Sequence, residues 1–269
     1  MPAKLPKAKK RFGQNFLTDE LVLRDIVAAA EISSSDTVLE IGTGTGILTE
    51  ALAKTAGQVI SVELDRELYA RYAERLRNIC GVRTVSGDFL REAAGIFASL
   101  NRRIKVIANI PYYITTPILE KLLDYRDRIA AIVLMVQKEV AARICAEPGG
   151  KEYGSLTVFL RYYADAELVR NVPRQCFTPR PQVDSALVRL IVRPEPKYRP
   201  LSEKRFFNIV RGAFWGRRKT LRNALKASPY THYTRAMLDR LEQTAGLDLN
   251  RRGETLSLEE YVALADVEF

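Results

Sequence analysis

The chain of 269 residues has few of the residue types on which many enzymes depend. Its single histidine, His232, argues against a zinc site or a Ser/His/Asp triad, because both need imidazole groups at specific places. The three cysteines, Cys80, Cys145 and Cys176, lie far apart and lack the spacing of metal ligands. We therefore expect reduced thiols, no bound metal and a cytoplasmic location.

Long hydrophobic runs are scarce as well. The longest obvious run, residues 129–136, is much shorter than the roughly 18 residues that a membrane helix needs. The basic start of the chain has no hydrophobic stretch behind it, unlike an export signal. We expect a soluble protein with no membrane partner, and a monomer.

The net charge of +10 is concentrated in two stretches. Five basic residues precede the first acidic residue, Asp19, and the ten basic residues from position 197 to 226 stand against the single acid Glu203. Such runs are either solvated faces or phosphate-binding surfaces, and charge alone does not decide between them.

Short apolar runs rich in Val and Ile predict a buried sheet. Five of them alternate with helix-like segments, at residues 37–42, 59–64, 82–85, 104–110 and 129–136. This alternation predicts a doubly wound α/β fold with a mostly parallel, Rossmann-like sheet. Two further strands, at residues 156–163 and 186–192, bring the total to seven. With no long helix between them, they should form an antiparallel hairpin at the sheet edge.

A proline-rich segment marks the end of this first domain. Residues 193–200 carry three prolines in eight positions and cannot continue a strand. The apolar residues that follow recur at helical spacing: Phe206, Ile209, Val210, Ala213 and Phe214. We predict a Rossmann-like domain over residues 1–195 and a small α-helical domain over residues 196–269.

A glycine-rich turn follows the first predicted strand. Gly42, Gly44 and Gly46 permit a tight turn where the backbone approaches a ligand closely. Their G-x-G-x-G spacing differs from the dinucleotide fingerprint G-x-G-x-x-G, because Ile47 occupies the last glycine position, and this disfavours a nicotinamide cofactor. Taken alone, the turn could also be an ordinary strand-to-helix connection.

Acidic residues end the next two strands. Glu63 lies where α/β nucleotide sites place a carboxylate on the ribose hydroxyls. Asp88 could accept the amine of an adenine ring, with Phe89 as a candidate stacking face. Each acid alone could be a capping or turn carboxylate, but together with the glycine turn they predict a nucleoside site at the carboxyl edge of the sheet.

The segment Asn109-Ile-Pro-Tyr after the fourth strand is the most informative one. Adenine's amine is a poor nucleophile because its lone pair is delocalised, so an enzyme gains by accepting hydrogen bonds from its N–H groups. The Asn109 side-chain oxygen and the Ile110 carbonyl suit this role, and Pro111 fixes the turn. Tyr112 offers a face for an extruded base. The alternative is an ordinary proline turn with Tyr112 in the core.

With these residues placed, the chain resembles the small-subunit ribosomal RNA adenine N6,N6-dimethyltransferase family. Relatives of that family include the erythromycin-resistance methyltransferases and the mitochondrial transcription factor B proteins. Residues 11–17, 177–186 and 217–223 also match its motifs. Thr43, Ile110 and Gly216 replace the more usual proline, leucine and glutamine; we expect Thr43 to loosen the glycine turn slightly and no proposed contact to be lost.

The resemblance implies S-adenosylmethionine as the cofactor and a set of residue roles. The implied cofactor-binding residues are Asn15, Leu17, Gly42, Gly44, Glu63, Asp88 and Asn109. The implied catalytic residues are Asn109, Ile110, Pro111, Tyr112 and Phe177. In this scheme Phe177 sandwiches the flipped base against Tyr112, although a core phenylalanine at a turn is the rival interpretation.

The implied reaction is N6,N6-dimethylation of two adjacent adenosines near the 3′ end of small-subunit ribosomal RNA, within an immature ribosomal subunit. The predicted RNA-binding residues are Lys9, Lys10, Arg11, Arg217, Arg218, Lys219 and Arg222. A large-subunit RNA methyltransferase, a DNA adenine methyltransferase and a non-catalytic RNA-binding assembly factor remain as alternatives. Residues 184–186 and the basic second domain favour the small-subunit group.

Overall fold

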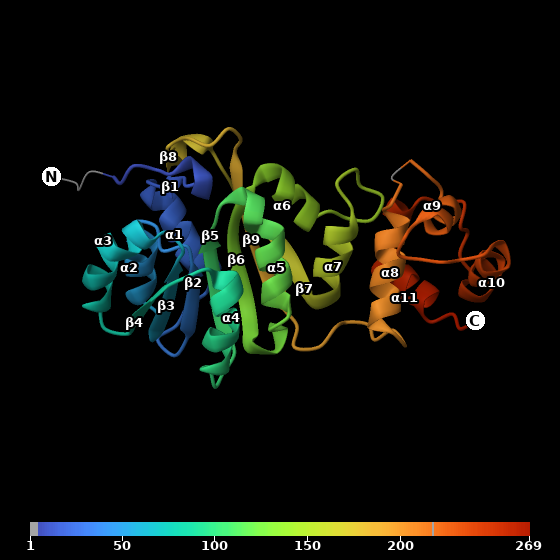
Figure 1. Cartoon of the computed structure of the whole chain (residues 1–269), viewed down its shortest axis with the longest axis horizontal. Helices are drawn as coiled ribbons and strands as arrows, with labels where there is room; N and C mark the ends of the chain where they lie inside the picture. Colours follow the sequence, from blue (N-terminus) through green and yellow to red (C-terminus); the bar gives the residue numbers. More distant parts are fainter. Residues whose placement is uncertain (1–4, 217) are drawn as a thin grey trace. The chain divides into compact units, whose positions relative to one another are not determined.

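The computed structural model describes residues 5–216 and 218–269, apart from the side chain of Lys10, and divides into two compact units (Figure 1). The sheet unit comprises the chain up to Ala141 together with Asp165–Pro194, and the helical unit comprises Ala142–Ala164 and Glu195–Phe269. The predicted second domain therefore lies within the helical unit. This unit also takes in Ala142–Ala164, which the prediction assigned to the first domain.

A seven-stranded sheet forms the centre of the sheet unit. Its strands are β2 (Thr37–Ile41), β3 (Gln58–Glu63), β4 (Val82–Ser86), β5 (Ile104–Asn109), β6 (Ile129–Gln137), β7 (Ala164–Val172) and β9 (Ser185–Val192). Their order is β4-β3-β2-β5-β6-β9-β7. The first five pair in parallel, and β9 pairs antiparallel to β6. The predicted doubly wound, mostly parallel sheet with an antiparallel hairpin is confirmed.

The strand order reverses between β2 and β5, and the helices of the sheet unit follow that reversal. These helices are α1 (Glu20–Ala29), α2 (Ile47–Ala53), α3 (Arg66–Arg77), α4 (Phe89–Ala98) and α5 (Thr115–Leu123), and α6 (Lys138–Ile144) leads out of β6. Because parallel crossovers are right-handed, α2 and α3 lie on one face of the sheet and α4 and α5 on the other. In Figure 1, α4 and α5 lie in front of the strands.

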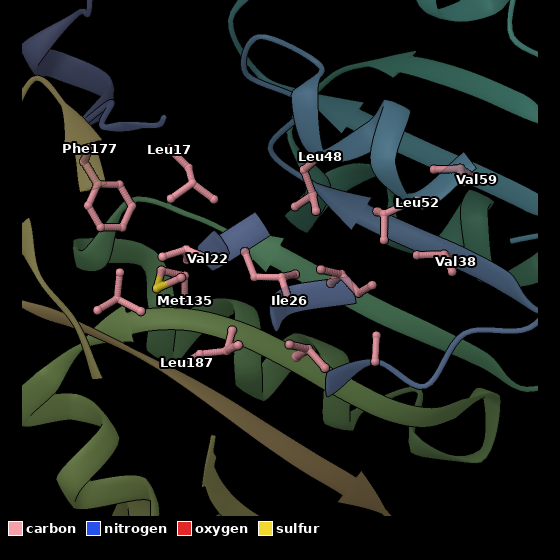
Figure 2. Close-up of a cluster of buried hydrophobic side chains, with 14 residues drawn as sticks. Leu17, Val22, Ile26, Val38, Leu48, Leu52, Val59, Met135, Phe177 and Leu187 are labelled. Carbon is pink, nitrogen blue, oxygen red and sulfur yellow. The ribbon is translucent and has the colours of Figure 1, made fainter. Parts of the chain in front are cut away.

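The sheet face that α1 and α2 cover carries a large buried cluster (Figure 2). Val38 of β2, Met135 of β6 and Leu187 of β9 are fully buried there. Ile26 of α1 and Leu52 of α2 pack against them. The neighbouring strand residues on the opposite face are buried as well. Burial on both faces explains why the strands read as near-continuous apolar runs.

A second, two-stranded sheet ties the N-terminal arm to the loop between β7 and β9. Its strands are β1 (Phe16–Leu17) and β8 (Phe177–Thr178), which pair antiparallel. Next to them, the Thr18 backbone N–H and hydroxyl both donate to the Cys176 carbonyl, at 2.9 and 3.1 Å. The arm is therefore part of the folded unit although it precedes the first helix.

The helical unit is built from α7 (Ser155–Tyr163), α8 (Glu203–Ala213), α9 (Leu221–Ala227), α10 (Arg235–Ala245) and α11 (Leu258–Ala265). The helical spacing predicted after residue 200 is confirmed by α8, which buries Phe206, Ile209 and Val210. Tyr162 of α7 stacks on Phe206, with ring centroids 4.8 Å apart. Aromatic packing of this kind contributes much of the core of so small a unit.

The predicted strand at residues 156–163 is wrong. These residues form α7, and the edge strand β7 begins only at Ala164. Their β-branched and aromatic composition favours a strand, but packing and local capping override that preference. The Thr157 hydroxyl accepts the Gly154 N–H at 3.1 Å and donates to the Arg143 carbonyl at 2.6 Å, which secures the first helical turn.

Two structural features are not found among the described residues. Between residues 5–216 and 218–269, no helix is both long and apolar enough to cross a membrane. The same part of the chain brings no three His, Cys, Asp or Glu side chains together in an arrangement that could hold a metal ion. Cys80, Cys145 and Cys176 are not joined in disulfides within the described chain.

The start of α2 provides a test of local strain. Gly46 precedes α2 with φ +81°, and an added Cβ would lie 2.9 Å from Cδ2 of the buried Leu76. We expect Gly46→Ala to lower the free energy of unfolding by about 1–3 kcal/mol, measured by urea denaturation. Gly95→Ala in α4 is the control, because no atom lies within 4 Å of its added Cβ. It should be neutral or stabilising by up to about 1 kcal/mol. Equal stabilities of the two variants would contradict the strain at Gly46.

Candidate active site

The carboxyl ends of the parallel strands surround a cavity of about 1120 Å³, counting the space open to solvent. It lies at the strand reversal between β2 and β5, where sheets of this kind bind ligands. All the residues predicted to bind the cofactor line it: Asn15, Leu17, Gly42, Gly44, Glu63, Asp88 and Asn109. Ile110, Pro111 and Tyr112 line the same cavity.

Glu63 is held in place by the backbone of the glycine turn and of its own strand end. The Gly44 N–H donates to Oε2 and the Asp65 N–H donates to Oε1, both at 2.8 Å. Burial raises the pKa of Glu63, and these two N–H bonds oppose that shift. Gly44 has φ +56°, a left-handed backbone conformation that residues with a side chain rarely adopt. Each Glu63 oxygen keeps a lone pair for a further donor.

Asp88 combines both roles that the sequence left open. It is the N-cap of α4, since Oδ1 accepts the Leu90 N–H at 3.0 Å. Its side chain also lines the cavity, with Phe89 next to it. The cap fixes one oxygen and orients the carboxylate. The other oxygen, Oδ2, lies 4.0 Å from Nε of the exposed Arg91 and keeps lone pairs for a ligand N–H.

The turn after β5 presents acceptors and an aromatic ring to the cavity. Within the described residues, no hydrogen bond is formed by the Asn109 side chain or accepted by the Ile110 carbonyl. Pro111 follows with φ −56°. The Tyr112 hydroxyl lies 2.5 Å from the hydroxyl of Ser185, a buried residue of β9, and burial raises the pKa of Tyr112. Ser185 thereby anchors the ring, a contact that the sequence did not predict.

Comparison with known proteins places this site in a family. Residues 5–264 match the family model described as ribosomal RNA adenine dimethylase. The chain belongs to this family. It is 46% identical to the ribosomal RNA small subunit methyltransferase A of Clostridium botulinum over 260 residues, which are 97% of this chain and 94% of the relative. The predicted resemblance is thereby confirmed.

Two solved structures match the chain over both of its units. A dimethyladenosine transferase from Plasmodium falciparum matches with a TM-score of 0.74 and 28% identity, covering 93% of this chain and 95% of the other. The 23S rRNA methyltransferase ErmE matches with a TM-score of 0.70 and 28% identity, covering 94% of this chain and 98% of the other. Both units of the chain therefore belong to the shared fold.

Phe177 stands apart from the other predicted site residues. It is 1% exposed and lies in the core cluster with Leu17 and Val22 (Figure 2). The described residues that line the cavity do not include it. In this structure Phe177 is a core phenylalanine, as the rival interpretation held. The sandwich of a base between Phe177 and Tyr112 stays a prediction, and it requires the Phe177 ring to be uncovered.

The N-terminal arm is fastened beside Glu63 by a network that the sequence did not predict. Lys9 Nζ lies 2.7 Å from Asp65 Oδ1 and 2.9 Å from Glu67 Oε1. Gln14 donates to Asp65 Oδ2 at 2.9 Å. Burial opposes ionisation of Asp65, but the hydrogen bonds from Lys9 and Gln14 outweigh it and hold the pKa of Asp65 below its usual value. Lys9, predicted to bind RNA, is thus engaged with two carboxylates.

The other predicted RNA-binding residues differ in how they are paired. The side chain of Lys10 and the whole of Arg217 lie outside the described residues. Arg218 and Lys219 are exposed and form no ion pair with any carboxylate of the described chain. Arg222 is paired with Asp239 at 2.6 Å and with Glu242. Arg11 is exposed and lies over the Phe12 ring.

A buried hydrogen-bond network fixes the glycine turn to the neighbouring strands and to α2. The Thr49 and Ser61 hydroxyls donate to Glu40 Oε2 at 2.5 and 2.6 Å. Because the Ser61 proton goes to Glu40, the Thr43 hydroxyl, 2.6 Å from Ser61 Oγ, must donate to Ser61. Thr43 was expected to loosen the turn, but this contact fastens the turn to β3. Burial raises the pKa of Glu40 to about 7.

The Glu40 carboxyl predicts a pH-dependent stability. Its folded-state pKa of about 7 lies above the ordinary 4.5, so its stabilising contribution is complete below pH 4.5 and is lost as the pH rises through 7. Between about pH 5 and pH 8, Glu40→Gln should gain about 2–3 kcal/mol in free energy of unfolding relative to the wild type. Urea denaturation across this range measures the difference.

The control for this prediction is Glu74→Gln, which removes an exposed carboxylate from α3. Its difference from the wild type should stay nearly constant with pH. A constant difference for Glu40→Gln would mean that Glu40 does not titrate in this range.

Proposed function

We propose that this protein transfers methyl groups from S-adenosylmethionine to the N6 atoms of adenosines in small-subunit ribosomal RNA. The product is N6,N6-dimethyladenosine at two adjacent positions near the 3′ end of the RNA, in an immature subunit. The observation that carries the proposal is a single cavity lined by the carboxylates Glu63 and Asp88 and by the acceptor turn at Asn109. The name of the relative at 46% identity supports the small-subunit substrate.

The donors and acceptors around the cavity fit S-adenosylmethionine. Glu63 would accept the two ribose hydroxyls, since its oxygens face the turn and keep free lone pairs. Asp88 would accept the adenine amine of the cofactor beside Phe89. The residues proposed to hold the cofactor are Asn15, Leu17, Gly42, Gly44, Glu63, Asp88 and Asn109. The bound cofactor supplies a methyl group on a positively charged sulfur, which departs as a neutral thioether.

The acceptor turn prepares the target amine. The Asn109 side-chain oxygen and the Ile110 carbonyl accept hydrogen bonds from its two N–H groups. These hydrogen bonds reduce the delocalisation of the nitrogen lone pair into the ring and aim it for in-line attack. Both acceptors are available, because no described residue occupies them. The attack leaves the nitrogen positively charged, and it becomes neutral again by releasing one proton to water. The monomethylated amine then keeps one N–H, so one of the two acceptors serves the second transfer.

Tyr112 supplies the stacking surface for the target base. Ser185 holds its hydroxyl, so the ring is oriented before a substrate arrives and less freedom is lost on binding. A base within an RNA helix cannot reach the cavity, and extrusion exposes the face that stacks on the ring.

Transfer of labelled methyl from S-adenosylmethionine tests the proposal. The substrate is a small ribosomal subunit that lacks adenine dimethylation, and the RNA is then analysed by nucleoside composition. We expect N6,N6-dimethyladenosine in small-subunit RNA. The large subunit and duplex DNA serve as comparison substrates, because ErmE, a structural neighbour, is a 23S rRNA methyltransferase. Label found only in the large subunit would contradict the proposed substrate and indicate large-subunit RNA instead.

The role of Asn109 is tested by substitution. Asn109→Ala should lower kcat on small subunits by about 10²–10³-fold, because it removes an acceptor aimed at the amine. Asn109→Asp keeps an acceptor oxygen and should recover part of the rate. The thermal midpoint of each variant controls for folding. Wild-type turnover by the alanine variant would refute the role of Asn109.

A further inference from the structure

An exposed aromatic pair lies in the helical unit, outside the cavity. Trp215, the only tryptophan of the chain, follows α8 and is 53% exposed, and Tyr230 is 41% exposed. Their ring centroids lie 5.9 Å apart with an interplanar angle of 82°. An edge-to-face contact covers at most one face of one ring, and the exposed fractions show that both side chains reach solvent. Exposed aromatic clusters of this kind mark binding surfaces more often than isolated apolar residues do.

The pair is held by the close packing of α8 on the turn after α9. An added Cβ at Gly212 would lie 3.0 Å from Leu225 Cδ2 and 3.2 Å from Thr231 Oγ1, so only glycine permits this approach without a shift. The Thr231 hydroxyl donates to the Leu225 carbonyl at 2.6 Å, and the Tyr230 N–H donates to Ser228 Oγ at 3.0 Å. The tyrosine of the pair is therefore preorganised, which favours binding.

Cations without carboxylate partners lie beside the pair or follow the tryptophan closely in the sequence, where Arg218 is exposed three residues after it. The Arg211 guanidinium lies 5.8 Å from the centroid of the tyrosine ring. The Lys219 side chain covers Gly216, which follows the tryptophan directly. Within the described chain, neither Arg211 nor Arg218 nor Lys219 forms an ion pair with a carboxylate, whereas Arg222 of the same basic run forms two. The charge at this surface is thus left for an external anion.

We propose that Trp215 and Tyr230 form a stacking platform for an unpaired RNA base, with Arg211, Arg218 and Lys219 on its phosphates. This inference rests on the proposed function only in taking RNA as the substrate. Aromatic faces with unpaired cations beside them fit a single-stranded nucleotide, because stacking and phosphate contacts act together. A duplex offers the phosphates but keeps its base faces stacked. The platform would hold RNA through a contact separate from the target adenosines.

Fluorescence of the single tryptophan tests the platform directly in the full-length protein. The probe is a single-stranded RNA of about ten nucleotides, and a duplex of the same sequence is the comparison. We expect the single strand to quench the fluorescence of Trp215 and the duplex to leave it nearly unchanged. Single-stranded RNA that binds without changing this fluorescence would overturn the inference.

Substitutions separate stacking from charge. Trp215→Leu should weaken binding of the single strand about fivefold or more, and Trp215→Phe should retain most of the affinity. The slope of log K against log salt should not change in either variant. In the double variant Arg218→Gln/Lys219→Gln the slope should fall by about 1.4. Leu201→Ala removes another exposed apolar side chain of the helical unit and is the matched control.

Further outcomes distinguish this inference from the proposed function. If the wild type methylates small subunits but Trp215→Leu binds RNA as tightly, the platform is refuted and the function stands. If the fluorescence responds to intact subunits but not to protein-free ribosomal RNA, the partner is a ribosomal protein and the inference is overturned. If the wild type binds RNA without methylating any, the proposed function fails, and the fluorescence and affinity measurements still decide on the platform.

Discussion

The site depends on one topological constraint, the reversal of strand order between β2 and β5. Parallel strands end at the same edge of the sheet, and here the helices that follow them leave to opposite faces. The edge between them stays uncovered, and the polar residues that follow each strand meet there. Gly44 and Glu63 come from one side of the reversal and Asn109 from the other. The proposed donor and acceptor sites are adjacent because of this topology, without the help of long loops.

The N-terminal arm lines the cavity with residues 12–17 and connects it to the loop between β7 and β9. Lys9 fastens the arm to Asp65, two residues after Glu63, and Leu17 pairs with Phe177 across β1 and β8. One short segment thus spans the proposed cofactor side and the loop that carries Phe177. Uncovering the Phe177 ring for a base would have to disturb its packing against Leu17. The predicted sandwich would therefore couple engagement of the target base to the position of the arm.

Sequence predicted those parts of the fold and site that depend on residues close together in the chain. Glu63, Asp88 and Asn109 follow apolar strands, and strand ends in such a sheet converge by rule. The helix at residues 155–163 was missed because its β-branched and aromatic composition favours a strand, while packing and the Thr157 cap decide for a helix. The clamp between Lys9 and Asp65 and the contact between Tyr112 and Ser185 join residues 56 and 73 positions apart. No local sequence pattern predicts contacts between residues so far apart.

Contacts between distant residues also decide which basic residues are available to RNA, and composition alone does not distinguish one cation from another. Formal charge identified two basic stretches but could not tell which cations were already paired. Lys9 and Arg222 are held by carboxylates from distant parts of the chain, so binding a phosphate would require them to give up those partners. Arg218 and Lys219 have no such partner among the described residues, so they give up no internal ion pair on meeting an anion. A cation without an internal ion-pair partner is therefore the better candidate for RNA binding, and only the folded structure shows which cations lack one.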